Sequence, residues 1–216
     1  MRPSGDGHLL RAFELDGPLE TERLILRPFT EGDFDFLFSI RSRPDVARYL
    51  LWGPQTEAQV RETLDQKIAS RAIREQDDVL ALAGVPKGTN EVIGDFILRL
   101  VSKEHQQGEI GFIIHPDHHG RGYATEAGRE LLRIAFEDVE LHRVVGILEA
   151  RNGPSARVLE KLGMRREAHL VENEFVKNEW QSELVYAMLD REWRRLTSEA
   201  QPLPPAPRSR RPGTSP

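Results

Sequence analysis

Apolar residues recur along this chain with two alternating periods, which predicts strands and helices that follow one another in sequence. Runs with an apolar residue at every second position are typical of strands, whereas spacings of three and four are typical of helices with one buried face. We expect strands at 22–28, 79–83, 92–101, 108–115, 143–150, 165–175 and 180–189, and helices at 30–41, 56–68, 124–135 and 152–163. The pattern indicates an α/β fold. Its three consecutive strands between 79 and 115 should form an antiparallel meander, and Lys177-Asn178 should form the turn of a closing hairpin.

The periodic pattern is weak at both ends of the chain. Residues 1–19 carry Gly, Pro and Asp with little periodicity, so we expect a loose lead-in there. Residues 197–216 are rich in Pro and contain Arg208, Arg210 and Arg211, a composition typical of a disordered tail. Neither an internal repeat nor a linker divides residues 20–196, which we expect to form one domain.

A strand, a glycine loop and a helix follow one another between Gly108 and Arg133. Gly120 and Gly122 allow the backbone to approach a ligand closely, and the first turn of the helix offers unpaired N–H groups at the positive end of its dipole. Such a junction suits a phosphate or pyrophosphate. A Walker loop is excluded because Tyr123 and Ala124 follow the second glycine. A dinucleotide-binding loop is a weak alternative, since Thr125 occupies the position of its third glycine.

The segment 117–127 (DHHGRGYATEA) resembles the GNAT superfamily of acyl-CoA-dependent N-acetyltransferases. Within that superfamily it is most similar to the branch that contains the ribosomal-protein N-terminal acetyltransferases RimJ and RimL. Two further segments match, 152–163 and the closing strand 180–193, and the resemblance covers about residues 20–194. Asp117 departs from the family, which usually has Gln or Arg at this position. The resemblance implies a GNAT fold, with a mixed central sheet of about seven strands flanked by helices.

The resemblance also implies the chemistry, which is direct transfer of an acetyl group from acetyl-CoA to a primary amine. Glu109 matches an acidic residue that acts as a base or orients the amine, although an exposed strand carboxylate is an equal alternative. Asn152 matches an asparagine that hydrogen-bonds CoA or the attacking region, or else it caps a helix. Ser155 matches a hydroxyl near the CoA sulfur, where it would protonate the leaving thiolate.

In the family, CoA binds along the strand and the glycine loop. The strand is bulged near residues 113–115 and separates from its successor, which leaves main-chain groups free for the pantetheine arm. The residues implied in CoA binding are Ile113, Ile114, His115, His119, Gly120, Arg121, Gly122, Tyr123, Ala124, Thr125, Asn152 and Arg157.

Three further sets of residues are open to more than one interpretation. Tyr49 and Trp52 match a loop that borders the acceptor groove in the superfamily, but packing between two helices is the favoured interpretation. His115, His118 and His119 lie within five positions, yet no acidic ligand pattern completes a tetrahedral zinc site. Loop histidines that face solvent or CoA are favoured, and we expect no metal.

Composition excludes several classes of protein. The 216-residue chain has a net charge of −5 and a pI near 5.9, which does not favour nucleic-acid binding. It contains no cysteine, which excludes disulfides, thiolate metal sites and a cysteine acyl-enzyme. No apolar run approaches the ~18 residues of a membrane span, and residues 1–10 lack a signal-peptide core. We therefore expect no membrane partner and a cytoplasmic location.

The acceptor amine must be neutral to attack. An α-amino group has a pKa near 8, so on the order of one in ten is neutral at pH 7, against roughly one in a few thousand for a lysine. We therefore expect the N-terminus of a protein as acceptor. A small-molecule amine, such as an aminoglycoside, a polyamine or an amino acid, remains the enzymatic alternative, and a non-catalytic acyl-CoA-binding module is the alternative from another class. Homodimers are common in this superfamily, so a homodimer is possible.

Overall fold

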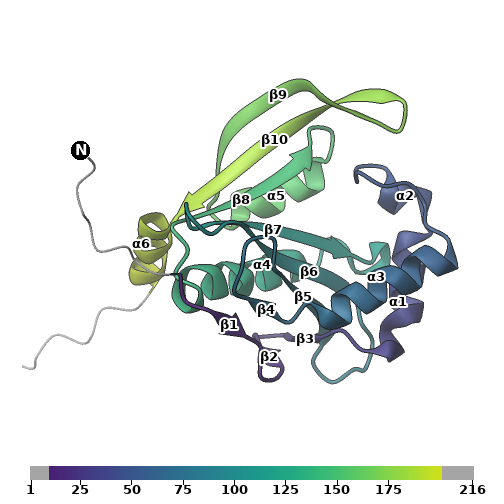
Figure 1. Cartoon of the computed structure of the whole chain (residues 1–216), viewed down its shortest axis with the longest axis horizontal. Coiled ribbons are helices and arrows are strands. Elements are labelled where there is room, and N and C mark those ends of the chain that lie inside the picture. The colour runs from purple at the N-terminus through teal and green to yellow at the C-terminus, as the bar shows by residue number, and fades with distance from the viewer. Residues whose placement is uncertain (1–9, 201–216) are drawn as a thin grey trace, which may run out of the picture.

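The structure, a computed structural model that describes residues 10–200, is built on one large mixed sheet (Figure 1). Its eight strands lie in the order β2-β3-β5-β6-β7-β8-β10-β9, and every neighbouring pair is antiparallel except β7 and β8. The strands are β1 (Phe13–Glu14), β2 (Leu19–Glu20), β3 (Leu24–Pro28), β4 (Ala72–Ile73), β5 (Val79–Pro86), β6 (Gly94–Ser102), β7 (Gln107–Ile114), β8 (Arg143–Glu149), β9 (Arg165–Val176) and β10 (Glu179–Leu189). The expected meander is present as β5, β6 and β7.

Helices cover both faces of this sheet. The helical elements are η1 (Glu31–Asp33), α1 (Phe34–Arg41), α2 (Pro44–Ala47), α3 (Glu57–Ala69), η2 (Pro116–His118), α4 (Tyr123–Arg133), the π-helical turn η3 (Ile134–Asp138), α5 (Gly153–Lys161) and α6 (Asp190–Ala200). Leu37 of α1 and Leu64 of α3 pack in one buried cluster with Ala81 of β5. Leu131 of α4 packs in the other cluster, against Phe96 of β6. The sheet therefore separates α1 and α3 from α4, so that a ligand between its strands meets different helices on each side.

The ends of the described chain differ from the sequence expectation. The expected lead-in contains β1, which pairs with β4, and β2, which pairs with β3 and raises the strand number of the large sheet from about seven to eight. The expected tail from residue 197 is also wrong in its first residues, because α6 continues to Ala200. Trp193, expected in the closing strand, lies in α6 and donates its indole N–H to Glu137 Oε1 at 2.8 Å. Residues 1–9 and 201–216, with Arg208, Arg210 and Arg211, lie outside the described residues.

The closing hairpin has the expected position and reaches beyond the body of the molecule toward α2 (Figure 1). Its turn is Lys177-Asn178, and both residues have positive φ, 51° and 65°. Two consecutive residues with positive φ are typical of the tight turn that follows the right-handed twist of a hairpin. The tip of the hairpin is therefore held in a fixed direction.

The parallel pair β7 and β8 is joined along only part of its length. Gln107, Gly108 and Glu109 pair with Arg143–Val145, and the ladder ends there, although β7 continues to Ile114 and β8 to Glu149. The strands separate because β8 stays paired with β10 as far as Glu149. The bulge expected near residues 113–115 is absent, since β7 keeps one register with β6 from Gly108 to Ile114. The sheet is thus split by the divergence of two regular strands.

Candidate active site

Two adjoining cavities open at this split. The α3-side cavity has a volume of about 500 Å³ and lies against β5, β6, β7 and α3, whereas the α4-side cavity, of about 530 Å³, lies against the glycine loop and the start of α5. Both are bordered by the same six residues, Tyr49, Leu50, Phe112, Ile113, Asn152 and Ser155. A ligand group in one cavity can therefore meet a ligand group in the other at the split between β7 and β8.

The α4-side cavity has the properties of an anion site. Gly120 and Gly122 have φ of 75° and 81°, and Gly122 is the N-cap of α4 without a side-chain cap. The first N–H groups of α4 are therefore left for a ligand, with the positive end of the helix dipole behind them. His118 Nδ1, which is buried and lacks a hydrogen-bond partner among residues 10–200, belongs to a side chain in the cavity wall. Arg157 adds a cation to the same wall.

Most of the expected cofactor residues border this cavity, namely Ile113, Ile114, His119, Gly120, Gly122, Ala124, Thr125, Asn152 and Arg157. Two further residues border this cavity: His118, expected only as a loop histidine that faces solvent or CoA, and Lys161, which sequence analysis missed. Lys161 follows Arg157 by four residues on α5, and this spacing is a signal that both point to the same side.

Three expected cofactor residues turn their side chains elsewhere. His115 Nδ1 accepts from the backbone N–H of Asp117 at 3.3 Å, and Arg121 Nη2 donates to the carbonyl of Asp117 at 3.1 Å. Tyr123 lies under the guanidinium of Arg23, 4.9 Å from its ring centroid. These side chains stabilise the loop, so any contact of the three residues with a ligand would come from their main-chain groups.

Glu109 lies at the point where β7 and β8 separate, and its side chain borders the α3-side cavity. Its carboxylate has no hydrogen bond or ion pair with another residue in the range 10–200. Burial raises the pKa of Glu109, with Glu183 raising it further and Arg99 lowering it. A partly buried carboxyl with a raised pKa and a free oxygen has the properties of a general base.

Asn152 and Ser155 stand where the two cavities meet. Asn152 Oδ1 accepts from the backbone N–H of Ser155 at 3.2 Å, so Asn152 is the helix cap of α5. The Ser155 hydroxyl makes no hydrogen bond with the described residues. The cap therefore fixes the start of α5 at the junction and leaves this hydroxyl for a ligand.

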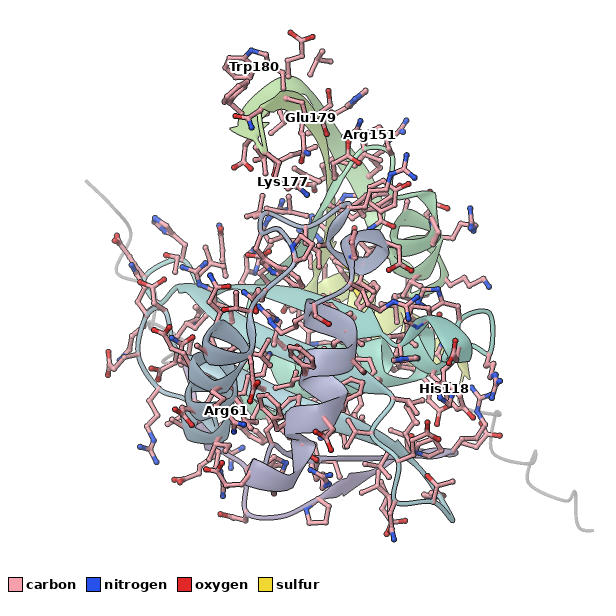
Figure 2. The ribbon with its side chains drawn as sticks, turned by 90° about the vertical axis from the view of Figure 1, so that its right-hand side faces the viewer. Arg61, His118, Arg151, Lys177, Glu179 and Trp180 are labelled. Atoms are coloured by element: carbon pink, nitrogen blue, oxygen red, sulfur yellow. The ribbon has the colours of Figure 1, made fainter. Side chains whose placement is uncertain are left out.

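The segment 47–52, here called the roof segment, covers the junction from the other side. Tyr49 and Trp52 both border the α3-side cavity. Trp52 also packs against the guanidinium of Arg41 at the end of α1, as the favoured interpretation of packing expects. Lys177, at the hairpin tip, donates from Nζ to the carbonyls of Ala47, Arg48 and Leu50 at 2.8, 3.0 and 2.8 Å (Figure 2). The hairpin thereby holds the roof segment in place.

Comparison with known proteins agrees with this geometry. Residues 23–165 match the model of the acetyltransferase (GNAT) domain. The crystal structure of a GNAT-family acetyltransferase from Bacillus anthracis is 30% identical and superposes with a TM-score of 0.74, covering 81% of this chain and 99% of that one. An uncharacterized N-acetyltransferase, p20 of Bacillus licheniformis, is 30% identical over 81% of this chain and 97% of its own length. The structure of spermidine N-acetyltransferase from Vibrio cholerae with CoA and spermine has a TM-score of 0.68 at 22% identity, covering 79% and 98% of the two chains.

The family match and the fold together define an acyltransferase enzyme. The chain belongs to the GNAT acetyltransferase family. Proteins of this family use acetyl-CoA as donor and an amine as acceptor.

Two properties of residues 10–200 bear on other functions. No three side chains of His, Cys, Asp or Glu gather as a set that would hold a metal ion. The histidines at 115, 118 and 119 are therefore not brought together as ligands. No helix in this range is long and apolar enough to cross a membrane.

Replacing Lys177 tests the role of the roof segment. We expect Lys177→Met to raise the KM for the acceptor amine by about 10-fold, because three hydrogen bonds from one ammonium group hold the segment over the acceptor side. The KM for acetyl-CoA should change less, by about 2- to 3-fold in steady-state assays, because Tyr49 and Leu50 of the roof segment also border the α4-side cavity. Lys87→Met is the matched control, because Lys87 pairs with Glu20 at the far edge of the sheet. Equal changes in both KM values would contradict this role.

Proposed function

We propose that this enzyme transfers the acetyl group of acetyl-CoA to the N-terminal α-amine of a protein or peptide. The observation that carries the proposal is the meeting of the two cavities beside Glu109, Asn152 and Ser155. An anionic donor on the α4 side and an amine on the α3 side would react at this junction.

The α4-side cavity fits the CoA part of the donor. Main-chain N–H groups from Gly120 to Thr125 would hold the pyrophosphate, and Arg157 and Lys161 would add charge-assisted contacts. The unpaired second half of β7, which includes residues 113 and 114, offers main-chain groups to the pantetheine amides as an adjacent strand would.

The chemical step requires a base, a stabilised oxyanion and a leaving group. Glu109 would accept a proton from the ammonium group, directly or through water, so that the neutral amine attacks the thioester carbonyl. A C–N bond forms and the C–S bond breaks, while main-chain N–H groups of β7 stabilise the oxyanion. Ser155 would donate a proton to the departing CoA thiolate and take in its place the second proton that the nitrogen loses as the amide forms. The products are then the N-acetyl amide and CoA-SH, and the proton on Glu109 passes to water.

An α-amine suits this site because it needs little help from a base. Its pKa is near 8, so roughly one molecule in ten is already neutral at pH 7. The segment 117–127 also resembles the RimJ/RimL branch of N-terminal acetyltransferases. A polyamine is the second candidate, because the similar protein from Vibrio cholerae is a spermidine N-acetyltransferase.

The proposal is tested by incubating the purified protein with acetyl-CoA and either peptides with free N-termini or spermidine. Released CoA and the mass of the product are measured. We expect one acetyl group on the α-amine of a peptide, and none on the same peptide with a blocked N-terminus. Acetylation of spermidine alone would refute the peptide acceptor. Binding of acetyl-CoA without transfer to any amine would refute the transferase reaction and favour a non-catalytic acyl-CoA-binding module.

A further inference from the structure

A buried arginine faces the α3-side cavity. Arg41, the last residue of α1, is only 9% exposed, and its side chain is part of the cavity wall. Its Nε donates to Gln55 Oε1 at 2.7 Å, and its guanidinium lies over the ring of Trp52, 4.2 Å from the centroid. Because these two contacts fix one edge and one face of the guanidinium, its two terminal nitrogens have a set direction.

Those terminal nitrogens lack a partner. Within residues 10–200, Nη1 and Nη2 of Arg41 make no hydrogen bond and no ion pair. Burial lowers the pKa of Arg41, and Asp95 attracts the guanidinium without forming an ion pair with it. Asp95 is itself paired with Lys67 Nζ at 2.7 Å. A desolvated cation without a close counter-ion is costly, and an anionic ligand would offset that cost.

The α3-side cavity has equal numbers of positively and negatively charged wall residues. Its charged wall residues are two cations, Arg41 and Lys67, and two acids, Asp95 and Glu109. Since Lys67 and Asp95 neutralise each other, the cavity presents one free cation and one free carboxyl within the described range. A polyamine carries only positive charges and would place them near Arg41, which is unfavourable.

The free carboxyl of Glu109 and the acid that acts on Arg41 stand at different places along the sheet. Asp95, which lies close enough to act on Arg41, pairs with Ile113, whereas Glu109 pairs with Arg99. Ile113 and Glu109 are four positions apart on β7, which corresponds to about 13 Å at the rise of a strand. An extended peptide covers the same length with about four residues.

We propose that the acceptor is an amine that also carries a carboxylate, namely a peptide N-terminus with Asp or Glu among its first four residues. This inference rests on the proposed function. The amine lies beside Glu109, and the carboxylate accepts two hydrogen bonds from Nη1 and Nη2 of Arg41. A bidentate contact of this kind fits the fork of the guanidinium, and a lysine could not replace it. Arg41 is therefore a specificity-determining residue.

The test compares matched peptides that differ only by Asp or Asn at positions 2, 3 and 4. With the wild-type enzyme we expect kcat/KM to be about 10- to 100-fold higher for the best Asp peptide than for its Asn partner. In Arg41→Gln the ratio should fall to about 1. Each ratio is taken within one variant, so a partial loss of folded enzyme cancels. A ratio near 1 in the wild type, or an unchanged ratio in Arg41→Gln, would overturn the inference.

Arg61→Gln is the matched control. Arg61 lies on α3, borders neither cavity and pairs with Glu57 on the helix surface (Figure 2). This variant removes the same charge from the same side of the sheet. We expect it to keep the preference for the Asp peptide, and loss of the preference would show that net charge, not Arg41, sets it.

A binding experiment separates this inference from the proposed function. The Nα-acetylated Asp peptide cannot react, and its affinity is measured by calorimetry with CoA present. We expect it to bind the wild type at least about 10-fold more tightly than Arg41→Gln. If this holds but no peptide is acetylated, the carboxylate site is real and the proposed function is wrong. If peptides are acetylated without preference and this affinity is unchanged in Arg41→Gln, the proposed function holds and the inference is wrong.

Discussion

Glu109→Gln should lower kcat/KM for the acceptor amine by about 10²- to 10⁴-fold, the usual range for loss of a general base. The amide keeps the shape of the carboxyl but cannot accept the proton. The side chain borders the α3-side cavity beside the split and makes no hydrogen bond within residues 10–200 that the substitution would break. The measurement is a steady-state assay of CoA release. A loss of less than about 3-fold would show that Glu109 is not needed as the base, because water accepts the proton or enough of the amine is already neutral.

The stability of this variant provides an internal control. Burial raises the pKa of Glu109, so the folded state holds the proton more tightly than the unfolded state does. Its contribution to stability is present at low pH and is lost as pH rises through the raised pKa. Above the raised pKa the wild type bears the cost of a partly buried charge, which Gln removes. The melting temperature of Glu109→Gln should therefore be equal or higher, and exposed Glu104→Gln should keep full activity.

The pH profile identifies the base more directly. The acid limb of kcat/KM should follow the ionisation of Glu109 and disappear in Glu109→Gln. Glu183 raises the pKa of Glu109. Glu183→Gln should therefore move this limb to lower pH, and a limb that stays in place would assign it to another group.

Gly122→Trp should abolish the binding of acetyl-CoA. At about 100 times its dissociation constant, a ligand stabilises the folded protein by about 2.7 kcal/mol, which thermal unfolding detects as a rise in melting temperature. Gly122 has φ of 81° at the N-cap of α4, and a β-carbon there would lie 3.3 Å from Arg23 Nη2. An indole at this position would occupy the place of the pyrophosphate.

Gly88→Trp is the matched control for backbone strain. Gly88 also has φ of 81°, and nothing lies within 4 Å of a β-carbon added there. Both variants should melt at a lower temperature than the wild type, but only Gly88→Trp should keep the increase caused by acetyl-CoA. An increase that survives in Gly122→Trp would show that the glycine loop does not hold the donor.

Most of the fold could be predicted because each long element carries its own periodic pattern. The meander, the glycine loop with α4 and the hairpin around Lys177-Asn178 are of this kind. The short strands β1 and β2 have only two residues each, and they exist through pairing with β4 and β3. The helix α6 is almost wholly polar and buries Trp193 against Phe136, a contact between residues far apart in sequence. The local sequence pattern does not predict strand pairs or side-chain contacts between residues so far apart in the chain.

The candidate site, like the fold, has residues that could be predicted from the sequence and residues that could not. Glu109, Asn152, Ser155 and the glycine loop lie in segments that resemble a known family, and the structure brings them to one junction. Arg41 was missed because an arginine at the end of an amphipathic helix is normally exposed. Its burial depends on Gln55 and Trp52, which belong to a later loop. Lys177 was likewise missed, because it contacts Ala47 across 130 positions of the chain.

The incomplete ladder between β7 and β8 places a free strand edge in the interior of the protein. Exposed edges at the rim of a sheet invite pairing with other chains and hence aggregation. Here the gap is bounded on one side by β8 and closed from above by the roof segment that Lys177 holds. Main-chain amide groups of an extended ligand can pair with this free edge in the place of the missing strand. The divergence of β7 and β8 that leaves this edge unpaired thus places it at the walls of the two cavities, where a ligand can pair with it.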